Sequence, residues 1–429
     1  MKALLLTAIL CCSAALPAAT PRATLTGTVL DANGNPLVGV TVMVYHAGVK
    51  VGYSTYCPSC YLDCGKRVLT DAKGAFEIKD LAGDLWFTLL AARAGYVPQI
   101  TKSIDPAKNP TLTLNLAAKP PTTNFSGTVR GRVVESDGSP VPDAIITPTG
   151  LNLNAKELSA VFPAGTPVSE GEHSIYGTLD GLQPIATTNK QGEFELSYNQ
   201  PTPKMLLEVE ARAMAPKFVV METGPQRHSV TLTDGATITG RLLANGKPVP
   251  NAQVGLIAKD RGGFQDNLKI AGDPYAEIRI GTGADGRFTI PNVPGPVDWY
   301  LYAEMDSISS MGATSPIEVK VTHDGQYLQT ADLVVKPGYR VRGTVLVSDN
   351  KPIPEGMRVT ISSDTVWDSQ TVPLAPDGHF AFVNLPPGKY SINASVKGYR
   401  EKESQYGPTP FTVDHDIDNF TTTVYPNAR

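Results

Sequence analysis

The sequence predicts an all-β protein built from four tandem antiparallel β-sandwich domains of about seven strands each. A fourfold repeat, short runs of alternating apolar and polar residues, and no segment with a useful helical period together predict this class. The repeat begins with a Gly, a short apolar run, a turn and a Pro, at Gly27, Gly131, Gly240 and Gly343. Its intervals of 104, 109 and 103 residues suit a whole small domain better than a solenoid unit.

The opening run of each repeat and the segment after its Pro turn are expected to be strands. Residues 40–45 of the first copy and 252–257 of the third alternate between β-branched or other apolar residues and more polar ones. A period of two is typical of a half-buried strand, because successive side chains point to opposite faces of a sheet.

A second motif in each repeat predicts a hairpin followed by an aromatic strand. Its four copies cover residues 70–78, 189–194, 285–290 and 377–382. Gly tolerates positive φ and Asp bonds its own backbone, so an Asp and a Gly before alternating residues favour a tight turn. The Phe that follows is expected to point into the core. A further turn and strand follow, as at residues 385–394.

These signals divide the chain into a leader, four domains and one linker. The Pro-rich linker is expected to be stiff and extended, leaving the first domain hinged while the other three form a semi-rigid rod. The expected boundaries are 1–19 for a signal peptide, 20–118 for the first domain with its Cys-rich insertion, 119–125 for the linker, and 126–234, 235–337 and 338–429 for the remaining domains.

The first residues have the features of an export signal. Lys2 is followed by an apolar run that ends near Ala15, and the small residues Ala18 and Ala19 favour cleavage there. That run is too short to remain as a membrane span, and no later run is long enough. A secreted or periplasmic, cell-envelope location is therefore expected. A net charge of −4 with 18% charged residues provides no basic field for nucleic acid.

Together the two motifs resemble the carboxypeptidase regulatory-like domain, a seven-stranded β-sandwich of transthyretin or prealbumin type. The resemblance covers nearly the whole mature chain and is plainest in the first and fourth copies, whereas the second has Asn189 in place of Asp. It implies a module that often occurs without an enzyme. Structurally it is grouped with starch-binding-like sandwiches, which implies carbohydrate as a ligand class.

Catalytic motifs are missing from the sequence. None of the six His residues has Glu at the third following position, as a metallocarboxypeptidase would need, and no Gly-x-Ser-x-Gly is present. We therefore expect no enzymatic activity and no cofactor.

Three Cys residues lie close together in the first domain: Cys57, Cys60 and Cys64. In an oxidising compartment one local disulfide with one thiol left over is expected. Thiol–disulfide exchange and binding of a soft ion such as Cu(I) or Zn(II) are the alternatives. Asp63 and His46 are the candidates for a fourth zinc ligand.

Aromatic residues that alternate out of the core are the candidate ligand-binding residues. When the strands after Gly83, Gly295 and Gly388 are aligned, the second, fourth and sixth residues after each Gly are expected to face inward. Flat aromatic rings on a sheet can stack on sugars or anchor a protein partner, although packing against a neighbouring repeat is the alternative. The residues expected to face outward are Trp86, Leu90, Tyr300 and Tyr302.

The sequence thus predicts a secreted, non-catalytic binding or scaffold protein. Its expected partner is a carbohydrate or a cell-surface protein, with no nucleic acid and no membrane span. One alternative is thiol-redox or soft-metal chemistry at Cys57, Cys60 and Cys64. The other is an adhesive or structural spacer without a small ligand.

Overall fold

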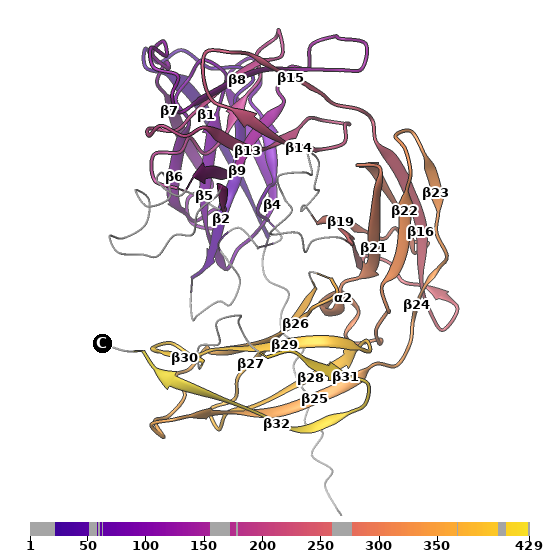
Figure 1. Ribbon diagram of the computed structural model, residues 1–429. Helices are drawn as coiled ribbons and strands as arrows, with labels where there is room; N and C mark the ends of the chain where they lie inside the picture. Colours follow the sequence, from indigo (N-terminus) through magenta and orange to yellow (C-terminus); the bar gives the residue numbers. More distant parts are fainter. Residues whose placement is uncertain are drawn as a thin grey trace, which may run out of the picture.

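In the described residues of the computed structural model, eight β-sheets form four β-sandwiches, which confirms the predicted fold class (Figure 1). The expected signal peptide, Cys57 and Cys60 lie outside the described residues. The structure describes residues 22–50, 58, 61, 63–154, 172–176, 179–259, 277–366, 368–401 and 409–427.

The first domain pairs the sheet β4–β1–β7 with the sheet β3–β2–β5–β6. Its strands are β1 (Arg22–Asp31), β2 (Thr41–Val49), β3 (Arg67–Leu69), β4 (Ala75–Ala82), β5 (Leu85–Ala92), β6 (Gln99–Ile104) and β7 (Thr111–Leu116).

The second domain pairs β12–β8–β15 with β10–β9–β13–β14, and β11 joins β9. Its strands are β8 (Thr128–Val134), β9 (Ile145–Asn154), β10 (Glu172–Tyr176), β11 (Ala186–Thr187), β12 (Glu193–Ser197), β13 (Lys204–Glu210), β14 (Lys217–Glu222) and β15 (His228–Thr231).

The third domain pairs β17–β16–β20, extended by β23 and β24, with β19–β18–β21–β22. Its elements are β16 (Ala236–Ala244), β17 (Lys247–Pro248), β18 (Gln253–Ala258), β19 (Ile278–Gly281), β20 (Arg287–Val293), β21 (Val297–Ala303), α2 (Met305–Ile308), β22 (Ile317–Val321), β23 (Tyr327–Gln329) and β24 (Leu333–Val335).

The fourth domain pairs β28–β25–β32–β30 with β27–β26–β29–β31. Its strands are β25 (Tyr339–Val347), β26 (Arg358–Ser363), β27 (Ser369–Pro373), β28 (His379–Leu385), β29 (Gly388–Ser395), β30 (Tyr399–Glu401), β31 (Phe411–Val413) and β32 (Ile417–Pro426). Among the described residues no helix is long and apolar enough to span a membrane.

Each domain also contains parallel pairing beside the predicted antiparallel pairs. The first strand of every domain runs parallel to its last strands: β1 with β7, β8 with β15, β16 with β23 and β24, and β25 with β32. Parallel neighbours need a long crossover, and here the intervening strands provide it by building the opposite sheet.

The two repeated motifs meet in the core as one structural unit. In each domain the opening Gly lies directly across the strands from the Phe of the second motif, and all four Phe side chains are buried, as predicted. A Cβ atom at Gly27 would lie 2.6 Å from the ring of Phe76. The ring therefore occupies the space that a side chain would need. The four pairs are Gly27–Phe76, Gly131–Phe194, Gly240–Phe288 and Gly343–Phe380.

The hairpin before each Phe contains a glycine with positive φ, between 70° and 85°. The side chain of Asp71 accepts hydrogen bonds from the backbone N–H groups of Lys73 and Ala75 at 2.8 and 2.9 Å. Asn189 accepts the equivalent pair in the second copy, so its amide replaces the carboxylate without loss. In the other two copies the acid is adjacent to the Gly and accepts one such bond. The four glycines are Gly74, Gly192, Gly286 and Gly378.

The first two domains pack against each other through the outer face of β2 and β5. Leu90 and Ala92 are buried against Ile145 and Ile185 of the second domain. The prediction of a hinged first domain is therefore wrong, because apolar side chains on its outer face are covered by its neighbour.

The Pro-rich segment is also held against the second domain. Lys119 Nζ lies 3.1 Å from a carboxylate oxygen of Glu195 and 3.3 Å from the side-chain oxygen of Gln183. Thr122 also donates a hydrogen bond to Glu195. These contacts fix the segment that was expected to act as a free linker.

The third and fourth domains are joined by α2. Met305 of this one-turn helix is only 3% exposed and belongs to the core of the fourth domain. Asn384 donates a hydrogen bond of 2.6 Å to the carbonyl oxygen of Ser309. The four domains follow a curved path in Figure 1.

Candidate binding surfaces

Trp86 lies on the outer face of the sheet β3–β2–β5–β6 and is 38% exposed. The side chains of Leu85, Phe87 and Leu89 are buried in the core. Strand alternation therefore places Trp86 on the opposite face, as the sequence predicts. Its neighbour on β2 is Gly48, which has no side chain to cover the indole.

A lysine is fixed beside this ring. Lys50 Nζ lies 5.6 Å from the centre of the Trp86 ring, a cation–π distance. The same ammonium bonds Asp105 at 2.6 Å and the carbonyl oxygen of Gly83 at 2.7 Å. Its hydrogen bond and charge keep the pKa of the buried Asp105 carboxyl below its usual range. The ammonium is thereby anchored near the indole.

Polar groups continue the same face along β2 and β5. Thr88 lies opposite His46. The His46 ring stacks on Tyr45 with the ring centres 4.1 Å apart. Burial and the nearby charge of Lys102 lower the pKa of His46. We call His46, Lys50, Trp86 and Thr88 the Trp86 surface: it combines a partly exposed ring with groups that can form hydrogen bonds.

Two of the residues expected to be exposed are buried between domains. Leu90 points away from its own core but is 0% exposed, because the second domain covers it. Tyr302 is 1% exposed, packs with Ile257 and Val366, and donates a hydrogen bond to Glu277. Alternation identified the outer face at both positions but did not show that a neighbouring domain covers it.

Tyr300 lies at the edge of the same contact. It is partly buried, and Lys259 Nζ lies 5.6 Å from its ring centre. The inward assignment of Trp299 and Leu301 is correct, since both are fully buried. Trp86 and Tyr300 therefore lie on surfaces of different domains.

Cys64 is a half-buried free thiol whose Sγ donates a hydrogen bond to the carbonyl oxygen of Pro58 at 3.3 Å. Burial raises the pKa of this thiol, which lowers the thiolate fraction that metal binding and redox exchange require. Cys57 and Cys60 lie outside the described residues, so the local disulfide stays a prediction.

The proposed fourth zinc ligand Asp63 has another role. It is 2% exposed, and its carboxylate lies 2.8 Å from both Arg22 and Lys66. It also accepts a hydrogen bond of 2.8 Å from the backbone N–H of Ala82. These contacts tie β1 to the end of β4. Within the described part of the chain no group of three or more His, Cys, Asp or Glu residues could hold a metal ion.

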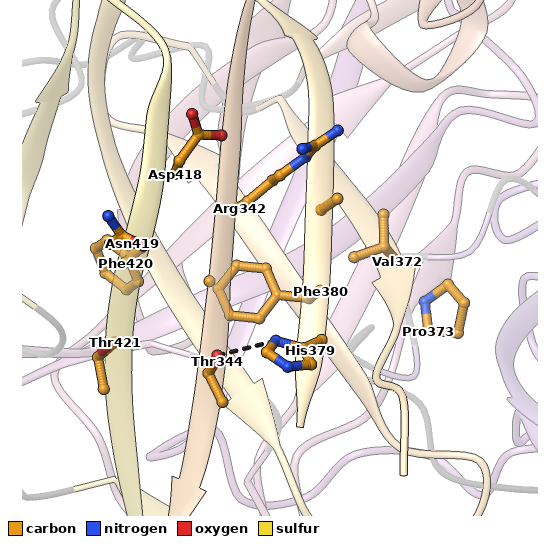
Figure 2. A pocket seen from close by; sticks show the side chains of 12 residues that line it. Arg342, Thr344, Val372, Pro373, His379, Phe380, Asp418, Asn419, Phe420 and Thr421 are labelled. Carbon is orange, nitrogen blue, oxygen red and sulfur yellow. Dashed lines mark hydrogen bonds between the residues drawn. The ribbon is translucent and has the colours of Figure 1, made fainter. Parts of the chain in front are cut away.

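A hollow of about 690 Å³ on the fourth domain was not predicted. Figure 2 shows Phe380 of β28 beside β25, with Thr344 and His379 joined by a hydrogen bond of 3.0 Å. The lining residues come from β25, β28 and β32 of one sheet and from β27 of the other, so only the assembled domain creates the hollow. The other lining residues are Arg342, Gly343, Val372, Pro373, Ala381, Asp418, Asn419, Phe420 and Thr421.

Thr344 and His379 resemble the first two members of a catalytic triad, but the third contact is weak. The nearest carboxylate oxygen of Asp377 is 3.9 Å from His379 Nε2, beyond hydrogen-bond distance. His379 and Asp377 are each 67% exposed. An imidazole that no carboxylate orients and that is open to water is a poor general base.

A family model describes part of this chain. The carboxypeptidase regulatory-like domain matches residues 24–119 and 340–418, which are the first and fourth domains. The first and fourth domains therefore match the carboxypeptidase regulatory-like domain, as the two motifs predict. A comparison with curated proteins finds no match.

Solved structures with resemblance to the chain include a Streptococcal ancillary pilin, with 12% identity over 70% of this chain and 100% of that one, at a TM-score of 0.22. The Bacillus anthracis TIE protein has 10% identity over 91% of this chain and 69% of that one, at 0.18. BcpA, the major pilin subunit of Bacillus cereus, has 11% identity over 74% and 100%, also at 0.18. Similarity at this level carries no functional argument.

Proposed function

We propose that this protein is a non-catalytic scaffold, located outside the cytoplasm, that holds β-sandwich domains in packed pairs and presents the Trp86 surface to a carbohydrate. The observation that carries the proposal is the burial of apolar side chains between domains. Leu90 and Met305 are 0% and 3% exposed, although each lies outside the core of its own domain.

Packed domain pairs suit a scaffold because they fix the distance between surfaces. Removing an exposed Leu from water contributes about 1.5–3 kcal/mol, and one flexible linker would contribute nothing comparable. Arg67 and Glu210 add an ion pair of 2.9 Å across the first pair of domains. A spacer or adhesive protein needs this rigidity whether or not it binds a small ligand.

Carbohydrate is the ligand class that the Trp86 surface fits best. The apolar face of a sugar ring can stack on an indole, and Trp86 is exposed enough to offer one. Hydroxyl groups around the sugar ring would find the polar side chains of Thr88 and His46 on the same sheet face. Thr88 and His46 come from adjacent strands, so the polar groups are fixed relative to the ring.

The test is glycan binding by the full chain and by Trp86→Ala. We expect soluble polysaccharides to bind the native protein and the variant to lose at least about tenfold in affinity, measured by calorimetry on hits from a glycan array. Tyr327→Ala is the matched control, because Tyr327 is an exposed aromatic residue, at 69%, on the third domain. Equal glycan affinity of Trp86→Ala and the native protein would show that the glycan does not bind at the Trp86 surface. If the native protein bound no glycan at all, the proposal would be reduced to a spacer without a carbohydrate ligand.

A further inference from the structure

Four carboxyl groups and one guanidinium meet where α2 of the third domain docks on the fourth. The third domain contributes Glu277, Arg279, Glu304 and Asp306, and the fourth contributes Asp368. Asp368 is 8% exposed, and the side chains of Glu277 and Glu304 are 9% and 13% exposed. We call the four acidic residues the interface carboxyls.

These groups are held at the contact by direct bonds. The Asp368 carboxylate accepts a hydrogen bond of 2.9 Å from the backbone N–H of Met305, the residue that enters the core of the fourth domain. Arg279 lies 2.5 Å from Glu277 and 2.9 Å from Glu304. The interface carboxyls therefore surround the same helix that joins the two domains.

Two tyrosines also lie at this contact, and their side chains are neutral hydrogen-bonding groups. Tyr302 donates a hydrogen bond to Glu277, and Tyr390 lies within the electrostatic reach of Asp368. Asp306 accepts a hydrogen bond from the backbone of Thr371 in β27. Within the described part of this contact, the guanidinium of Arg279 pairs with Glu277 and Glu304, and three of the four carboxyls are shielded from water.

Ionised carboxyls are costly in such a place, because a buried charge needs a partner to replace its hydration. Burial raises the pKa of Asp368 well above its ordinary value and also raises the pKa of Glu304. Burial and the charge of Glu304 raise the pKa of Asp306 to about 6. The side chain of Asp306 is nevertheless open to solvent, which screens its charge, so Asp368 and Glu304 carry most of the effect.

We propose that the interface carboxyls make the docking of the third domain on the fourth depend on pH, with tight docking in mild acid and looser docking as the carboxyls ionise. The sign follows from linkage. A group whose pKa is higher in the docked state stabilises docking fully below its ordinary pKa, and this contribution is lost as pH rises through the raised value. Each unit of such a shift corresponds to about a tenfold change in the docking equilibrium.

Oxidation of Met305 by dilute hydrogen peroxide tests this in the full chain, because undocking exposes its thioether. Peptide mass spectrometry would follow the oxidation rate between pH 4.5 and 8. We expect the Met305 rate to rise at least about tenfold toward neutral pH. Met311, which is 45% exposed, is the internal reference, and Met357, in the core of the fourth domain at 3%, reports unfolding.

Two neutral variants separate the carboxyls from other effects of pH. In Asp368→Asn and in Glu304→Gln the rise of the Met305 rate should shrink, with Met357 still protected. Asp324→Asn, in an exposed turn of the third domain, should keep the native profile. A flat native profile, or a native profile in both interface variants, would overturn the proposal. So would parallel oxidation of Met305 and Met357, which would indicate unfolding of the fourth domain in place of undocking.

Discussion

At the scale of residues, a Gly faces a Phe in the core of every domain. The ring of the Phe lies over the neighbouring backbone at a point where a side chain would collide with it. At Gly27 a Cβ atom would meet both Phe76 and the carbonyl oxygen of Leu112 on the adjacent strand β7. The close approach of three strands, more than backbone flexibility, explains the glycine.

We predict that Gly27→Ala destabilises the first domain by about 1–3 kcal/mol, because the methyl group overpacks the core. Differential scanning calorimetry of the full chain would show a lower melting temperature for that domain. Gly48→Ala is the matched control, since Gly48 lies on β2 of the same domain with no other atom within 4 Å of its Cβ position. If Gly27→Ala and Gly48→Ala had the same melting temperature, Phe76 would be able to move aside freely.

At the scale of elements, three domains contain a buried threonine just before the hairpin. Its side chain forms hydrogen bonds with the backbone of the turn that precedes the second strand of the domain. Thr282 accepts a hydrogen bond of 2.9 Å from the backbone N–H of Ala252 and donates one of 2.7 Å to the carbonyl oxygen of Val249. Thr70 and Thr188 form the equivalent bonds. The fourth domain has the buried Leu374 at the corresponding place. One side chain thus satisfies two backbone groups of an irregular turn.

Replacing Thr282 with Val should cost the third domain about 1–3 kcal/mol, because a buried N–H and a buried carbonyl lose their partner. Thr289→Val, at an exposed position on β20 of the same domain, should change stability by less than about 0.5 kcal/mol. The measurement compares the melting temperatures of the two variants in the full chain. Equal values would mean that the turn rearranges and finds other partners.

The strands and the inward Phe residues could be predicted from the sequence because both depend on local alternation and turn chemistry. The parallel pairing of first and last strands could not, since alternation carries no information on which strand lies beside which. Trp86 was correctly placed on an outer face. Leu90 and Tyr302 were placed on an outer face as well, but a second domain covers them, and no pattern within one repeat records its neighbour.

At the scale of the whole molecule, neighbouring domains contact one another and are not independent units on flexible linkers. The first and second domains share a buried apolar contact, and the third inserts Met305 into the fourth. Between the second and third domains, Asn292 donates a hydrogen bond of 2.9 Å to the carbonyl oxygen of Asp234. A curved chain of packed domains holds its outer surfaces at fixed positions, which is the property that a scaffold requires.

Small-angle X-ray scattering of the full chain, with Leu90→Asp for comparison, tests this central claim most directly. Leu90 faces away from its own core, so a charge there should break the contact between the first two domains and leave each folded. We expect the native profile in mild acid to fit the curved arrangement of Figure 1, and we expect Leu90→Asp to increase the radius of gyration. If the native profile were already that of a flexible, extended chain and did not change in Leu90→Asp, the claim that the domains are packed would be contradicted.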